Sequence, residues 1–162
     1  MSIGLFAIDE QGGMGANDDL PWPHNKDDMM WFKKTTEHQV VVMGRKTWES
    51  EGMPKPLPKR HNVIITHNFL PREDIVQIRG NVVDGLQFIQ DKFKDEDVDV
   101  FVIGGPDILM QARPALDKIY LTRIPGEYFC DSYIDIDGFL SKFELINTHE
   151  LGSCKVEEYE AI

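Results

Sequence analysis

The sequence is poor in cysteine, in positive charge and in long apolar runs. Its 162 residues include two cysteines, Cys130 and Cys154, too few for a disulfide framework or a structural zinc site. Seventeen Lys and Arg against 28 Asp and Glu give a net charge of −11, which repels nucleic acid and anionic membranes. The longest apolar run is far shorter than the roughly 20 residues that span a bilayer, and the N-terminal MSIGLFAIDE lacks the basic region and cleavage site of a signal peptide. We therefore expect a cytoplasmic protein, by default a monomer, without nucleic-acid or membrane partners.

The fingerprints of several enzyme classes are also missing. Gly12-Gly13-Met14-Gly15 and Gly104-Gly105 do not complete the G-x-G-x-x-G motif of dinucleotide-binding folds. There is no P-loop, no G-x-S-x-G turn, no metal-binding His pair and no Cys-His pair of recognisable spacing. Covalent and metal-dependent catalysis therefore have little support, and we expect no bound metal.

The chain length and the pattern of apolar residues predict one α/β domain over residues 1–162. Short apolar runs alternate with helical stretches, which favours an eight-stranded mixed sheet, mostly parallel, with a C-terminal antiparallel hairpin and about four flanking helices. The predicted strands are Ile3–Ile8, Val40–Met43, Asn62–Thr66, Ile75–Ile78, Val98–Ile103, Lys118–Arg123, Phe143–His149 and Cys154–Tyr159. The predicted helices are Lys26–Thr36, Arg45–Ser50, Gly85–Lys94 and Pro106–Arg113.

The first candidate site lies on the helix predicted over Lys26–Thr36. It follows a long loop, Gln11–Asn25, of a length typical of lids and binding loops. Asp28, Phe32 and Thr36 are spaced i, i+4 and i+8 and share one helical face, where an acid beside an aromatic ring suits a flat heterocycle with N–H donors. The alternative is that Asn25 caps the helix and Asp28 belongs to a loose capping box.

The second candidate site comprises two turns in which a buried strand leads into a helix. Met43-Gly44-Arg45-Lys46-Thr47 combines a helix N-terminus with two cations, which favours phosphate binding, although such cations are also common on solvated faces. Val102-Ile103-Gly104-Gly105-Pro106 places two glycines where backbone can approach a ligand closely. Two such turns could hold one dinucleotide.

Six ordered stretches of the chain resemble the dihydrofolate reductase family, and the resemblance covers nearly the whole sequence. They are Gly15 with Leu20-Pro21-Trp22, Asp28 with Trp31-Phe32-Lys33, Met43-Gly44-Arg45-Lys46-Thr47-Trp48-Glu49-Ser50, Pro56-Leu57-Pro58 with Arg60, Val102-Ile103-Gly104-Gly105, and Tyr120-Leu121-Thr122.

The resemblance implies NADPH-dependent reduction of 7,8-dihydrofolate to tetrahydrofolate, in support of one-carbon and thymidylate metabolism. Hydride would pass to C6 of the pterin and a proton to N5, with Asp28 holding the pyrimidine edge of the pterin and Arg60 pairing with the α-carboxylate of the glutamate tail. Catalytic roles fall to Asp28, Leu20, Trp22 and Thr122. Substrate contacts fall to Leu5, Phe6, Asp28, Phe32, Leu57, Arg60, Ile103 and Thr122.

For the cofactor, the resemblance implies NADPH with a 2′-phosphate near basic residues, and a cis peptide between Gly104 and Gly105. The cofactor contacts implied are Ala7, Gly15, Asn17, Gly44, Arg45, Lys46, Thr47, His67, Gly104, Gly105, Ile108 and Leu109. This chain has Leu109 where many relatives have tyrosine, Asp107 close to the expected pyrophosphate, and a longer Glu51–Pro56 segment.

Two alternatives remain open from the sequence. One is a related NADPH reductase of a pyrimidine or riboflavin precursor, against which Asp28, Phe32 and Arg60 argue. The other is a non-catalytic pterin-binding, nucleotide-binding or structural protein that retains the fold, because binding residues can survive the loss of turnover.

Overall fold

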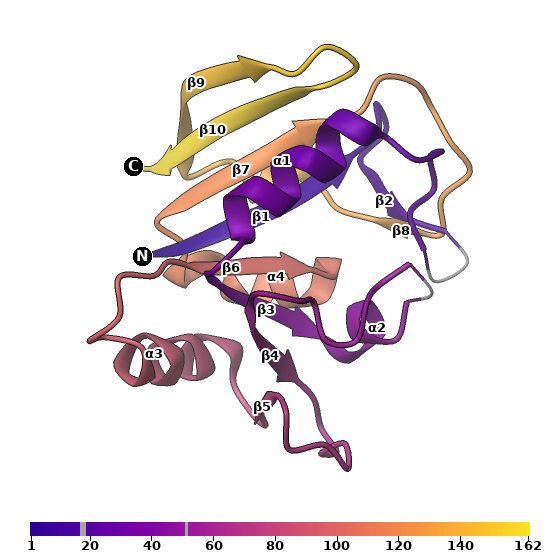
Figure 1. Ribbon diagram of the computed structural model, residues 1–162. Coiled ribbons are helices and arrows are strands. Elements are labelled where there is room, and N and C mark those ends of the chain that lie inside the picture. The colour runs from indigo at the N-terminus through magenta and orange to yellow at the C-terminus, as the bar shows by residue number, and fades with distance from the viewer. Residues whose placement is uncertain (17–18, 51) are drawn as a thin grey trace.

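An eight-stranded twisted sheet organises the chain, as Figure 1 shows for the computed structural model, which describes residues 1–16, 19–50 and 52–162. The strand order is β5-β4-β3-β6-β1-β7-β10-β9, parallel from β5 to β7 and antiparallel in β10 and β9. The strands are β1 (Ser2–Ile8), β2 (Gly13–Gly15), β3 (Val40–Gly44), β4 (His61–Ile65), β5 (Val76–Ile78), β6 (Val100–Gly104), β7 (Lys118–Arg123), β8 (Ser132–Tyr133), β9 (Phe143–Glu150) and β10 (Lys155–Ala161). The predicted fold class and C-terminal hairpin are confirmed.

Helices cover both faces of this sheet, so the core is divided in two. Residues of α1 and α2 pack with Leu5, Val41 and Phe101 on one face, whereas α3, α4 and α5 pack with Phe6 and Val42 on the other. The helices are α1 (Lys26–Thr36), α2 (Arg45–Trp48), α3 (Val82–Lys92), α4 (Pro106–Ala112) and α5 (Ile136–Phe139), with a 3₁₀ turn, η1 (Arg113–Ala115). In Figure 1, α1 crosses in front of β1 while α4 lies behind the sheet.

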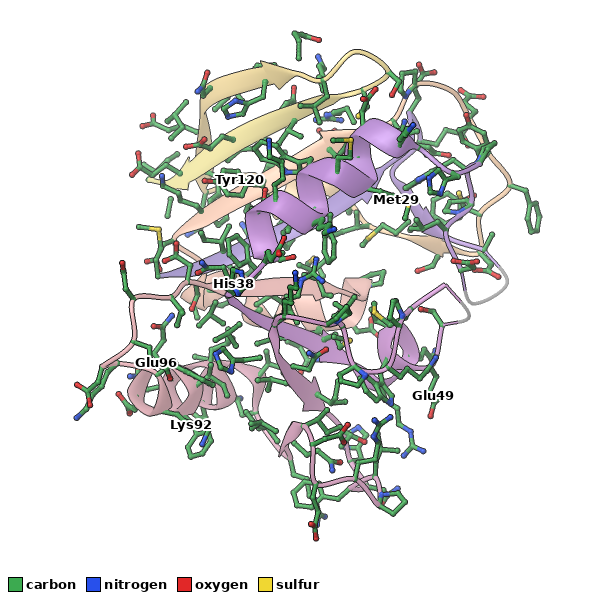
Figure 2. The ribbon with its side chains drawn as sticks, viewed as in Figure 1. Met29, His38, Glu49, Lys92, Glu96 and Tyr120 are labelled. Carbon is green, nitrogen blue, oxygen red and sulfur yellow. The ribbon has the colours of Figure 1, made fainter. Side chains whose placement is uncertain are left out.

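Aromatic contacts fix α1 on the sheet. The Trp31 ring meets Tyr120 of β7 edge-on at 5.8 Å between centroids and lies 5.3 Å from His149 of β9. In Figure 2, Tyr120 and Met29 are labelled on opposite sides of α1, Tyr120 on the side of β7 and β10, and Met29 is exposed. The inner side of α1 is therefore held against β7, which brings its polar residues to the sheet.

Both long helices begin at an asparagine that caps them. The Asn25 side chain accepts a hydrogen bond from the Asp28 amide at 3.0 Å, and Asn81 does the same for the Asp84 amide at 3.1 Å. The first helix has the predicted bounds, but α3 begins at Val82 and not at Gly85. The cap at Asn81 explains the earlier start.

Besides η1, three short elements were not predicted. β2 lies inside the segment expected to be an open loop, where it pairs antiparallel with β8, and α5 precedes the C-terminal hairpin. Each has at most four residues, too few for a periodic pattern. Within the described ranges, no helix is long and apolar enough to cross a membrane.

Candidate active site

Asp28 is the acid of the site, and it lies between α1 and β7. Its carboxyl group hydrogen-bonds with the hydroxyl of Thr122, which is buried near the C-terminal end of β7. Burial raises the pKa of Asp28 above its ordinary value, and the Thr122 hydrogen bond offsets part of that rise. A carboxyl group in this setting can accept hydrogen bonds from N–H groups of a heterocycle and hold a proton more readily than an exposed acid.

A capping role does not account for this acid. Asp84 occupies the same position of α3, three residues after the capping asparagine, and it is exposed. The cap on α1 is made by the Asn25 side chain to the Asp28 backbone, while the Asp28 carboxyl group contacts Thr122 of another element. The matched position shows that helix capping requires neither burial of the acid nor a partner on the sheet.

Apolar residues form a wall beside Asp28 on the α1 face of the sheet. One cluster contains Leu5, Leu57, Phe32 and Ile103, which are four of the residues predicted to contact substrate. Phe6 does not join them, because neighbouring side chains of a strand point to opposite faces. Its ring packs on Phe139, 5.5 Å between centroids, in the other core cluster. The Phe6 side chain therefore lies on the far face from Asp28, and only its backbone could line the site.

Arg60 lies at the far end of α1 from Asp28 and is held by three contacts. Its Nε donates to Thr36 Oγ1 at 3.1 Å and its Nη1 donates to the Pro58 carbonyl at 2.8 Å. The guanidinium carbon lies 5.7 Å from the centroid of the Phe32 ring. Burial lowers the pKa of Arg60 and Glu37 opposes that shift, so the guanidinium stays charged.

The loop before α1 places Trp22 and Leu20 in opposite environments. Trp22 is buried against Ile124 and Cys154, with Ala7 packed on this cluster, and its indole N–H has no hydrogen-bond partner among the described residues. Leu20 is about half exposed, at 52%. The loop is attached through Gly15, whose carbonyl accepts from the Asp131 amide at 2.9 Å, whereas the predicted contact Asn17 lies outside the described residues.

The sequence does not predict that Cys154 packs against Trp22, close to Asp28. Burial, reinforced by the negative charges of Asp28 and Asp27, raises the pKa of its thiol to about 11. The thiol therefore stays neutral and packs behind Trp22 as a small apolar group. No motif or spacing marks it, because the contact that holds it near the start of α1, from its thiol to Asn25 Oδ1 at 3.8 Å, spans 129 residues.

The two glycine turns meet at one edge of the sheet, because β3 and β6 are adjacent parallel strands. The peptide between Gly104 and Gly105 is cis, as predicted. A Cβ on Gly104 would lie 3.2 Å from Thr47 Oγ1, and one on Gly44 would lie 2.8 Å from the Ile108 side chain. Only glycine leaves backbone exposed in so close a cradle.

Basic side chains lie near this edge of the sheet. Arg45 is exposed and pairs with Glu49 at 2.7 Å, while its Nη1 donates to the Asn68 carbonyl at 3.4 Å. Lys46 and His67 are also exposed near these segments.

Leu109 is fully buried in the core cluster on the α4 face, so its side chain cannot face a ligand as proposed from the sequence.

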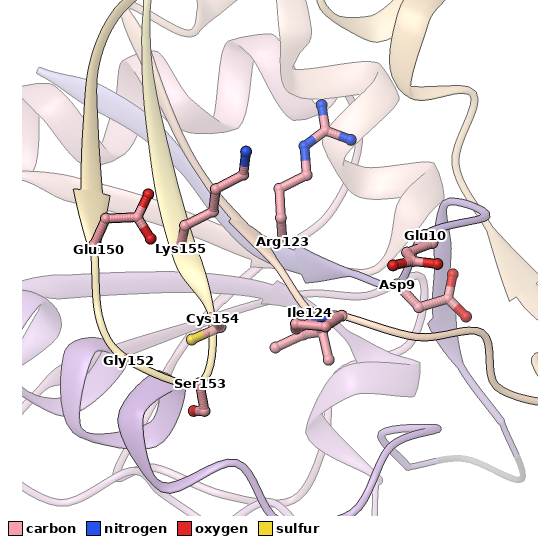
Figure 3. Close-up of a pocket in the computed structure, with 10 residues that line it drawn as sticks. Asp9, Glu10, Arg123, Ile124, Glu150, Gly152, Ser153, Cys154 and Lys155 are labelled. Carbon is pink, nitrogen blue, oxygen red and sulfur yellow. The ribbon is translucent and has the colours of Figure 1, made fainter.

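A surface hollow of about 400 Å³ lies outside this arrangement, at the ends of β1 and β7 and the β9–β10 turn (Figure 3). Its walls carry Arg123 and Lys155 on one side and Asp9 and Glu10 on the other. Neither Asp28 nor Arg60 lines it. The residues with the chemistry of a site are those on the α1 face and at the glycine turns, an arrangement typical of enzymes that bring a dinucleotide to a heterocyclic substrate.

Comparison with known proteins gives the family. The model of the dihydrofolate reductase family matches residues 2–161. A dihydrofolate reductase from Enterococcus faecium is 33% identical over 150 residues, covering 93% of this chain and 86% of that protein. The chain belongs to the dihydrofolate reductase family.

Two further relatives extend the comparison. A solved structure described as dihydrofolate reductase from Enterococcus faecalis complexed with NADP(H) and RAB-propyl superposes with a TM-score of 0.84 at 28% identity, covering 99% of this chain and 96% of that one. A bifunctional dihydrofolate reductase-thymidylate synthase from Paramecium tetraurelia is 37% identical over 152 residues. That match covers 92% of this chain but only 31% of the bifunctional protein.

Proposed function

We propose that the Asp28 pocket and the two glycine turns together perform the reaction of the family, NADPH-dependent reduction of 7,8-dihydrofolate to tetrahydrofolate. The observation that carries this proposal is the carboxyl group of Asp28, which is half-buried, raised in pKa and paired with Thr122 across two elements. The comparisons give no support to a reductase of pyrimidine or riboflavin precursors or to a non-catalytic role.

On the substrate side, Asp28 and Thr122 bind the pyrimidine edge of the pterin. Leu5, Phe32, Leu57 and Ile103 would pack on its rings and on the aromatic ring of the tail, since these side chains form one apolar cluster. Arg60 offers a planar fork to the tail carboxylate. The raised pKa of Asp28 favours a protonated site, which supports proton delivery to N5 through a water beneath the loop of Leu20 and Trp22.

On the cofactor side, the chain's groups suit NADPH. Gly44, Gly104 and Gly105 leave room for a pyrophosphate against backbone, and Thr47 adds a hydroxyl next to Gly104. Arg45 and Lys46 supply charge for the phosphates, with His67 near the expected 2′-phosphate. When bound, NADPH supplies the hydride; Ala7, Gly15 and Ile108 would contact it while Leu20 and Trp22 exclude water.

We also infer that the protein works as a monomer in the cytoplasm, where its product would serve one-carbon and thymidylate metabolism. Two observations support a cytoplasmic setting. The described cysteines are both free, and burial raises the pKa of each thiol to about 11, which keeps them unreactive. Sedimentation of the purified protein tests the oligomeric state directly.

The activity is tested by following the absorbance of reduced nicotinamide when the purified protein receives dihydrofolate with NADPH, and separately with NADH. Substrate-dependent oxidation that prefers NADPH is the expected result. If NADPH binds but is not oxidised with dihydrofolate, the proposed reaction is wrong. Oxidation with a reducible pyrimidine or riboflavin precursor instead would move the chain to another substrate class.

A further inference from the structure

The last turn of α1 links the apolar wall of the site to Arg60 through one hydroxyl group. Thr36 is fully buried, and its Oγ1 donates to the Phe32 carbonyl at 2.8 Å while it accepts from Arg60 Nε at 3.1 Å. The sequence predicts Thr36 as a hydroxyl that lines the pocket. In the structure this hydroxyl is already occupied on both sides, so it holds another side chain and is not free for a ligand.

The contacts of Arg60 leave a defined part of its guanidinium unused. Of its five N–H donors, the Nε group is taken by Thr36 and one on Nη1 by the Pro58 carbonyl. The remaining three N–H groups lie on the end formed by Nη1 and Nη2. This end presents the two parallel donors with which an arginine binds a carboxylate in bidentate fashion.

We propose that Thr36 is a positioning residue that fixes the orientation of Arg60 and thereby makes the site discriminate pterins with an anionic tail from pterins without one. This inference rests on the proposed function, in which Arg60 receives the tail carboxylate. Thr36 itself touches no reacting atom. Its effect reaches the substrate only through the guanidinium.

The physical reason is the freedom of an arginine side chain. Ordering a flexible side chain costs binding free energy, and a side chain ordered before the ligand arrives spares that cost. Without the Thr36 hydroxyl, the partly buried Nε loses its acceptor, and the charge of nearby Glu37 draws the guanidinium toward itself. The Michaelis constant for dihydrofolate should then rise roughly 10- to 150-fold, the range expected for one lost orienting hydrogen bond to a charged group.

The test compares Thr36→Val, which keeps the shape but removes the hydroxyl, with Thr36→Ser, which keeps the hydroxyl. The matched control is Thr35→Val, because the Thr35 side chain makes no hydrogen bond that the described structure records. Each protein is assayed with NADPH on two substrates, dihydrofolate and a 7,8-dihydropterin that lacks the benzoylglutamate tail. We expect Thr36→Val to raise KM for dihydrofolate with little change in kcat, and to leave KM for the tail-less pterin unchanged. Thr36→Ser and Thr35→Val should behave like the unchanged protein.

A double-mutant cycle with Arg60→Met completes the experiment. If Thr36 acts through Arg60, Thr36→Val should raise KM no further in the Arg60→Met background. Equal KM values for the unchanged protein and Thr36→Val would overturn the inference, as would an equal loss on both substrates. If the valine variant does not fold, Thr36→Cys takes its place, since a thiol has similar volume but is a weak acceptor. Absence of dihydrofolate reduction by the unchanged protein would instead refute the proposed function.

Discussion

Replacing Asp28 by asparagine is the sharpest test of the site, since it removes the charge and nearly preserves the shape. A hydrogen bond to a charged group contributes about 1.5–3 kcal/mol, and positioned proton transfer contributes about 10²- to 10⁴-fold in rate. The Asp28→Asn variant should therefore lose between about 10²- and 10⁴-fold in kcat/KM for dihydrofolate at neutral pH. Binding of NADPH should be unchanged, because the glycine turns lie at a different part of the sheet.

The control is Asp84→Asn, which changes the same position of α3 after an equivalent asparagine cap. Steady-state oxidation of NADPH gives kcat and KM, and quenching of protein fluorescence gives the affinity for NADPH. The control should retain full activity. If Asp28→Asn keeps kcat/KM within about threefold, or if Asp84→Asn loses as much, the assignment of the acid is wrong.

The same variant should also change stability in a predictable direction. The pKa of Asp28 is raised in the folded protein above its ordinary 3.8, so between these two values the folded state binds more protons than the unfolded state. The free energy of unfolding therefore falls as pH rises through that window. Asp28→Asn removes this dependence and should gain about 1 kcal/mol at neutral pH, as is common when a strained active-site charge is removed. Chemical denaturation at several pH values measures both effects.

Three further substitutions test other parts of the protein. Gly104→Ala places a side chain at φ +144° and 3.2 Å from Thr47 Oγ1, which should cost about 1–3 kcal/mol of stability and weaken NADPH binding. An unchanged melting temperature and an unchanged affinity for NADPH would contradict the claim that the cofactor site requires glycine at this position. Arg45→Gln should weaken NADPH more than NADH, by about 1.5–3 kcal/mol, and equal losses in titrations with both cofactors would remove Arg45 from the 2′-phosphate site. Burial raises the pKa of Glu157, but hydrogen bonds from Arg123 at 2.7 Å and from Tyr159 at 2.9 Å, together with the charges of Arg123 and Lys155, outweigh burial and lower the pKa. Glu157 therefore stabilises the fold above pH 4.5, and that contribution is lost as pH falls. Glu157→Gln should cost about 2 kcal/mol at neutral pH, with a smaller difference from the unchanged protein in acid; a constant difference in thermal melts would refute this.

The sheet was predictable because its strands carry strong local patterns. The run Val40–Met43 is apolar throughout, as a strand buried on both faces must be, and the predicted bounds of β7 and α1 match those observed. β2 and β8 carry no such pattern, since they form only by pairing with each other across more than a hundred residues. Local sequence cannot reveal a ribbon of that kind.

The site was predictable where spacing on one element decides the geometry. The i, i+4 spacing of Asp28 and Phe32 predicts one helical face, and in the structure Asp28 contacts Thr122 of the sheet while Phe32 packs in the cluster of Leu5. Strand alternation separates Phe6 from Leu5, and the sequence prediction did not apply it. The contact between Thr36 and Arg60 spans 24 residues and two elements, so no periodicity predicts it. Cys154 was missed for the same reason.

Strand β7 carries a consequence of its position between two kinds of pairing. Thr122 lies opposite Ala7 on parallel β1 and opposite Val156 on antiparallel β10, so backbone ladders on both sides hold it in register. A shift by one residue would present Leu121 or Arg123 to Asp28 in place of a hydroxyl group. The pKa of Asp28 therefore depends on the register of β7. Inserting one residue before Thr122 would turn its hydroxyl to the opposite face of the sheet and change the pKa of Asp28, although no residue of the site would be replaced.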